Sequence, residues 1–225
     1  MQYDPIVLQV PFNPQLVQYR KSICFESLDD AQKDSDALLS VVSERLVPKV
    51  LLCQFYIDAH FEIEGLPAVS INGVHFSGKA LSALDGVHRV IGYVATCGTE
   101  VEGYHLNHFD MLAPYWLDCL KTQALLQAQQ YLFSYCRTQF GIKKPLSLNP
   151  GSGNVDIWPI EQLQGLQRIL GGFEKIGVTL TESFLMIPNK TICGLLFASS
   201  SDYESCAYCE RENCPDRRVA FSKRL

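Results

Sequence analysis

The order of apolar and polar positions divides the first half of the chain into a helix followed by strands. Apolar residues recur at helical spacing between 38 and 46, which predicts one stripe of a helix. We expect its N-cap at Ser27, ahead of two acidic residues, and its end at Pro48. The apolar, β-rich run 50–57 predicts a buried strand, and Asn72-Gly73 between short apolar runs predicts a two-residue hairpin turn.

The second half of the pattern continues to mix helices and strands. It predicts a short helix at 79–84, a strand at 88–96 and the longest helix at 109–139. A further helix follows at 156–171, and then two strands at 178–186 and 191–198. The two element types do not alternate regularly, and hairpins occur near both ends. The pattern therefore favours an α+β fold, with an antiparallel sheet and flanking helices, over a doubly wound parallel sheet.

Composition and charge exclude several classes of partner. The chain has 225 residues, 47% of them hydrophobic, which is enough apolar surface for a substantial core. Its net charge of −5 argues against binding to nucleic acid, which needs clustered lysine and arginine. No run approaches the roughly 20 apolar residues of a membrane span, and residues 1–11 lack the basic flank of a signal peptide. We therefore expect a cytoplasmic protein without a membrane partner.

The carboxyl-terminal cysteines are the sharpest chemical signal in the sequence. The chain has nine cysteines, and the reducing cytoplasm disfavours a disulfide framework. The spacing of Cys206, Cys209 and Cys214 allows their thiolates to bind one metal centre. Soft thiolates select zinc or an iron–sulfur cluster. Both centres usually take four protein ligands. Cys193 is the nearest candidate for the fourth and Cys97 the second, and water, substrate or another chain is the alternative.

Several short segments follow one another in the order of a known family. They are Val94 to Val101, Ser147 to Gly153, Trp158-Pro159, Ile176 to Ser183, Met186 to Pro188 and Gly194 to Phe197. This order resembles the activation domain of cobalamin-dependent methionine synthase and the stand-alone relatives that accompany other corrinoid methyltransferases. The resemblance is closest over residues 88–200. We expect an activation-domain-like α+β domain at 1–200 and a cysteine-rich, metal-binding tail at 201–225.

The resemblance implies a function in the maintenance of vitamin B12. Domains of this family cap a corrinoid that a partner protein carries, and they assist its return from inert Co(II) to reactive Co(I). The chain is therefore expected to be a redox accessory protein that docks on a corrinoid-binding protein or methyltransferase and receives electrons from a donor protein. In this context a [4Fe–4S] cluster is the preferred metal centre, with zinc as the alternative.

One loop of the family binds S-adenosylmethionine, and here the sequence departs from the pattern. The family has an arginine three residues before the proline of the loop and a tyrosine after its glycine, whereas this chain has Ser147 and Ser152. A serine cannot replace the charged contact of an arginine with a carboxylate, which argues against S-adenosylmethionine. No catalytic residue is assigned. Four residues in the resembling segments are candidate cofactor contacts: Asn149, Gly151, Gly153 and Glu182.

Two other classes of function compete with the redox accessory protein. In one, the domain is a non-catalytic module that caps the corrinoid protein, and zinc has only a structural role in the tail. In the other, the chain is an S-adenosylmethionine-binding enzyme. The metal content separates the first alternative from the redox protein, and a binding titration tests the second.

Overall fold

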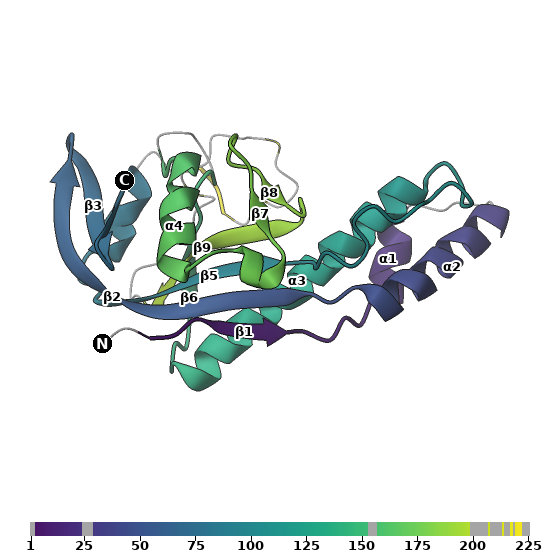
Figure 1. Ribbon diagram of the computed structural model, residues 1–225, viewed down its shortest axis with the longest axis horizontal. Helices are drawn as coiled ribbons and strands as arrows, with labels where there is room; N and C mark the ends of the chain where they lie inside the picture. Colours follow the sequence, from purple (N-terminus) through teal and green to yellow (C-terminus); the bar gives the residue numbers. More distant parts are fainter. Residues whose placement is uncertain are drawn as a thin grey trace.

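An antiparallel sheet with helices on both faces organises the chain (Figure 1). The computed structural model describes residues 3–23, 29–152, 157–198, 207, 213, 217 and 219–221. The α-helices are α1 (Leu16–Ile23), α2 (Asp29–Arg45), α3 (Ala113–Gln139) and α4 (Leu163–Leu170), and the 3-10 helices are η1 (Lys79–Leu84), η2 (Ile160–Gln162) and η3 (Glu174–Ile176). The strands are β1 (Ile6–Gln9), β2 (Lys49–Ile63), β3 (Leu66–Ile71), β4 (Val74–Ser77), β5 (Arg89–Thr96), β6 (Pro145–Leu148), β7 (Thr179–Leu180), β8 (Met186–Ile187) and β9 (Thr191–Ala198).

The large sheet has the strand order β4-β3-β2-β5-β9-β6, with β1 also paired to β2. Every strand pair is antiparallel, which confirms the predicted α+β fold with an antiparallel sheet. The strands β5 and β9 lie side by side in its centre, with Tyr93 opposite Gly194 and Val94 opposite Cys193. Successive side chains of β5 and β9 point to opposite faces of the sheet and therefore contact the helices on opposite sides of it.

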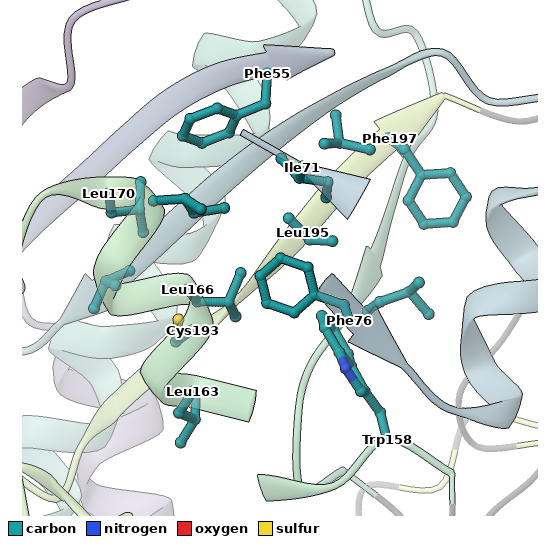
Figure 2. Packing of buried hydrophobic residues seen from close by; sticks show 14 of the residues in the cluster. Phe55, Ile71, Phe76, Trp158, Leu163, Leu166, Leu170, Cys193, Leu195 and Phe197 are labelled. Atoms are coloured by element: carbon teal, nitrogen blue, oxygen red, sulfur yellow. The ribbon is translucent and has the colours of Figure 1, made fainter. Parts of the chain in front are cut away.

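Three clusters of buried apolar residues correspond to the parts of the fold. On one sheet face, Leu51, Phe55 and Leu195 pack with α4, and Figure 2 shows this layer. On the other face, the second half of α3 covers a cluster that includes Val50 and Leu196. The third cluster lies at the helical end of the molecule, where α1 and α2 pack against the first half of α3. The sheet is thus buried on both faces, as a central layer requires.

Several predicted elements are confirmed close to their expected positions. Helix α2 ends at Arg45, before Pro48, and buries the predicted apolar stripe, whereas the expected N-cap Ser27 lies outside the described residues. Asn72 and Gly73 both have positive φ, 50° and 72°, and form the two-residue turn between β3 and β4. Positive φ at both positions is what a type I′ hairpin turn requires.

Other elements differ from the pattern. Strand β1 and helix α1 were not predicted, and α3 begins at Ala113, after the exposed Met111. Residues 178–186 were predicted as one strand, but they form β7, a turn and the start of β8. The predicted helix from Asp156 begins later, with η2 and α4, and Asp156 itself lies outside the described residues. Among the helices described here, none is both long and apolar enough to cross a membrane.

Candidate functional site

The end of β6 carries a network of polar side chains that join three strands. The hydroxyl groups of Tyr93 and Ser147 lie 2.8 Å apart, and Ser147 donates to Asn149 Oδ1 at 2.9 Å. The Asn149 amide nitrogen donates to Tyr93 Oη at 2.7 Å and to the carbonyl oxygen of Cys193 at 2.8 Å. Tyr93 is buried, and this burial raises the pKa of its hydroxyl to about 12, although the hydrogen bonds to Ser147 and Asn149 lower it.

Glycine at position 194 makes this network possible. A Cβ atom on Gly194 would overlap the carbonyl oxygen of Leu148 and would lie 2.6 Å from Asn149 Nδ2. Gly194 faces Tyr93 in the ladder between β5 and β9. Because this position has no side chain, the Asn149 amide can lie across the strand and reach both of its partners.

The loop after β6 is anchored at its turn. The backbone N–H of Gly151 donates to the carbonyl oxygen of Trp158 at 2.8 Å, and that of Ser152 donates to the carbonyl of Asn149 at 3.1 Å. Gly151 has a φ of 74°, and a Cβ atom there would lie 3.0 Å from the Ile160 side chain. Glycine therefore satisfies both the backbone conformation and the close packing of this turn. The predicted contact Gly153 lies outside the described residues.

The fourth predicted cofactor contact, Glu182, lies in the turn between β7 and β8, and its side chain is exposed. Side-chain and backbone bonds fix this turn: Thr181 Oγ1 accepts a bond from the Leu185 N–H at 3.0 Å and lies 3.1 Å from Ser183 Oγ. Phe184 adopts a φ of 62° and packs against the core beside α4. The turn thus presents Glu182 to solvent on a well-anchored hairpin.

A second anchored segment follows β5. Glu100 accepts a hydrogen bond from the Val47 N–H at 3.1 Å and forms an ion pair with Lys49 at 2.5 Å. Nearby, the half-exposed Glu102 pairs with the buried Lys121 of α3. These bonds attach the segment after β5 to the start of β2 and to α3, so the acidic groups are committed to ion pairs within the chain.

The two candidates for the fourth metal ligand lie in different layers. Cys193 is buried on the face of β9 toward α4, where Figure 2 shows it with Leu163 and Leu166. Cys97 is buried in the helical cluster. Burial raises the pKa of the Cys97 thiol to about 12 and that of Cys193 well above its ordinary value. Both surroundings favour the neutral thiol when no metal is bound.

The predicted tail ligands Cys206, Cys209 and Cys214 lie outside the described residues. Within the ranges that the structure describes, no three metal-ligating side chains gather at one point. The metal centre of the tail therefore remains a prediction from the cysteine spacing.

Asn149, Gly151 and Cys193 lie together around the end of β6, because Asn149 bonds the backbone carbonyl of Cys193 on β9 and Gly151 belongs to the same loop as Asn149. Glu182 lies on the β7–β8 hairpin. Sequence reasoning missed Tyr93, which lies in an apolar strand and gives no polar signal of its own. Ser147, expected to mark a lost ligand contact, is instead a member of the Tyr93 network.

Comparisons with known proteins agree with the resemblance that the sequence suggested. Residues 157–219 match the family model described as vitamin B12 dependent methionine synthase, activation domain. No curated protein sequence matches the chain. The fold is similar to a solved structure described as the MetH reactivation domain bound to AdoHcy, with a TM-score of 0.60 and 13% sequence identity over 90% of this chain and 81% of that chain. At this identity, the structural match shows the fold.

Proposed function

We propose that this chain, which is a member of the vitamin B12-dependent methionine synthase activation-domain family, docks on a corrinoid-binding partner and assists the reduction of its cobalt from Co(II) to Co(I). The match to the family model over 157–219 carries the proposal. That segment contains α4, the β7–β8 hairpin and β9, which are the elements that surround Glu182 and Cys193.

The β7–β8 hairpin is the surface that we propose for docking. Leu185 is 61% exposed and Ile187 is 50% exposed, beside the exposed carboxylate of Glu182. The hairpin is also tied to the sheet, because Thr191 donates a hydrogen bond to the Pro188 carbonyl at 2.7 Å. Exposed apolar side chains on a fixed turn are typical of a surface that a partner covers.

The tail thiols supply the redox part of the proposal. Cys206, Cys209 and Cys214 would hold an iron–sulfur cluster, with Cys193 as the fourth ligand and Cys97 as the alternative. A thiol that is neutral in a buried site loses its proton when it binds a metal, so the raised pKa of Cys193 lowers the affinity for metal but does not prevent binding. A cluster in this position would pass one electron to Co(II), giving Co(I), and a low-potential donor protein would reduce it again.

An S-adenosylmethionine-type ligand is a second candidate, because the solved structure with the similar fold is described as bound to AdoHcy. The loop residues of this chain offer such a ligand little charge. Ser147 and Asn149 are both engaged with Tyr93, and neither can form an ion pair with a carboxylate. A calorimetric titration with S-adenosylmethionine and with AdoHcy decides this point directly.

The decisive experiment measures cobalt reduction in a corrinoid methyltransferase that is poised as Co(II), under anaerobic conditions and with a limiting low-potential reductant. We expect the full chain to raise the rate of Co(I) formation, which the visible spectrum of the corrinoid reports. The variant Leu185→Asp should lose most of this gain, since it places a charge in the docking surface.

Met111→Asp is the matched control, because Met111 is 90% exposed and lies outside the segment that matches the family. This variant should keep the rate of the unchanged chain. A rate that does not respond to the chain at all, or an equal loss in both variants, would contradict docking through the hairpin.

A further inference from the structure

A cavity of about 500 Å³ lies between α3 and the segment 13–18, which leads into α1. Carboxamide side chains make up nearly all of its lining: Asn13, Gln15, Gln18, Gln123, Gln127 and Gln130. Leu126 is the remaining lining residue, so no charged side chain lines the cavity. Its volume falls in the range typical of small-molecule sites.

The glutamines of α3 already bind amide groups in this region. Gln127 accepts a hydrogen bond from the backbone N–H of Asn13 at 3.0 Å and donates one to its carbonyl oxygen at 2.6 Å. One turn earlier on the helix, Gln123 Oε1 accepts a bond from the N–H of Gln15 at 3.0 Å. The carboxamide of Gln127 thus bonds both the N–H and the carbonyl oxygen of one backbone residue, Asn13, in the wall of the cavity.

The side-chain nitrogen of Gln123 in this wall lacks a hydrogen-bond acceptor among the described residues. Gln123 is only 7% exposed. The Gln15 N–H donates to Oε1, so a rotation of the Gln123 carboxamide that exchanged its oxygen and nitrogen would break this bond and would not give Nε2 an acceptor. A buried donor without an acceptor destabilises the unliganded protein, and a ligand carbonyl would relieve this cost.

We propose that this cavity binds a small, neutral ligand that carries a carboxamide group. Nε2 of Gln123 exposes less than 1 Å² in the unliganded chain, so the side chains that cover it must move before the ligand carbonyl accepts its hydrogen bond, and the other carboxamides pair with the ligand donor. Anions and cations are disfavoured, because the lining offers no opposite charge to offset their loss of hydration. The proposal is independent of the function in cobalt reduction.

Succinamide is the probe that tests the proposal, and succinate, of the same size but doubly charged, is its counterpart. In NMR titrations of the full ¹⁵N-labelled chain, succinamide should shift the amide signals of 13–18 and 123–130 and saturate with a dissociation constant on the order of 1 mM. Succinate should leave these signals unchanged. No saturable shift with succinamide, or equal shifts with succinate, overturns the proposal.

Two variants locate the binding. Gln123→Glu keeps the acceptor for the Gln15 N–H but removes the amide donor, and it should weaken succinamide binding about tenfold. Gln139→Ala, at the exposed end of the same helix, should bind succinamide like the unchanged chain. Unchanged binding by Gln123→Glu overturns the assignment. If this variant does not fold, Gln130→Ala at the rim of the cavity takes its place and should also weaken binding.

Discussion

The side-chain amide of Asn149 donates a hydrogen bond to the backbone carbonyl of Cys193, across a distance of 2.8 Å. The bond joins two residues that the sequence assigned to different sites, one to a cofactor and one to a metal. It connects the loop after β6 to the central strand β9, and it is accompanied by the bond from Asn149 to Tyr93 on β5. The loop is therefore fixed to the middle of the sheet by a side chain, beyond the backbone pairing of β6 and β9.

The first prediction concerns this link. Asn149→Ala removes three side-chain hydrogen bonds, to Ser147, Tyr93 and Cys193, and leaves the Cys193 carbonyl without its side-chain donor, so we expect the free energy of unfolding to fall by about 1–3 kcal/mol. Urea denaturation measures the change. Asn189→Ala, at an exposed position near β9, is the control and should stay within about 0.5 kcal/mol of the unchanged chain.

The second prediction compares two glycines in neighbouring strands. A Cβ on Gly194 would meet the Leu148 backbone, which cannot move without breaking the ladder, whereas a Cβ on Gly92 would lie 2.9 Å from the Phe55 ring, which can turn. We expect Gly194→Ala to lower the free energy of unfolding by about 3 kcal/mol and Gly92→Ala by about 1 kcal/mol. Thermal and urea unfolding report both values, and the reverse order would refute this account of the close approach.

The third prediction concerns alkaline pH. Tyr93 has a pKa of about 12 in the folded chain, against about 10 when unfolded. Between these values the folded state keeps a proton that the unfolded state loses, so the stability from this group is complete below pH 10 and is lost as the pH rises toward 12. The slope reaches about 1.4 kcal/mol per pH unit.

Tyr93→Phe should remove this part of the pH dependence. The buried cysteines also have raised pKa values, but they are the same in both proteins, so the difference between the two profiles isolates Tyr93. Urea midpoints at a series of pH values from 9 upward, in steps of about 0.5, provide the measurement. Tyr131→Phe, an exposed tyrosine on α3, should keep the profile of the unchanged chain.

The fourth prediction concerns the metal centre of the tail. In protein purified without oxygen, Cys206→Ser, Cys209→Ser and Cys214→Ser should each lose most of the bound metal, since each removes one thiolate ligand. Cys119→Ser, on α3, should retain it. Metal and sulfide analysis gives the answer, and iron with sulfide distinguishes a cluster from zinc.

Cys193→Ser and Cys97→Ser then identify the fourth ligand. Loss of metal in only one of them assigns the ligand to that residue. Full retention in both leaves the fourth position to another donor and would remove Cys193 from the site.

The sequence was most informative where its signal is local. The Asn-Gly turn between β3 and β4 and the apolar spacing of α2 depend on neighbours in the chain, and both were located correctly. In α3, which was predicted as a helix at 109–139, the large apolar residues mark the buried face only in part. The buried face contains small residues such as Ala124 and Ala128, while Met111 and Leu126 are exposed, so large apolar residues pointed to the wrong side.

The network around Asn149 depends on contacts that are distant in sequence, and this is why its composition could not be predicted. Tyr93 and Ser147 are 54 positions apart and meet only because β5 and β6 both flank β9. The segment around Asn149 was recognised as important through its resemblance to a family. The hydrogen bonds from the Asn149 amide, however, reach residues of the sheet that are distant in sequence, and a motif of neighbouring residues cannot predict them.

Helix α3 runs without interruption from Ala113 to Gln139 and belongs to two separate cores. Trp116 and Leu120 pack in the helical end, whereas Leu132 and Cys136 pack beneath the sheet. At 1.5 Å per residue the helix is about 40 Å long, and a continuous helix of this length behaves as a stiff rod. The packing of the helical end and the packing beneath the sheet therefore share one continuous element, α3, and neither core is complete without it.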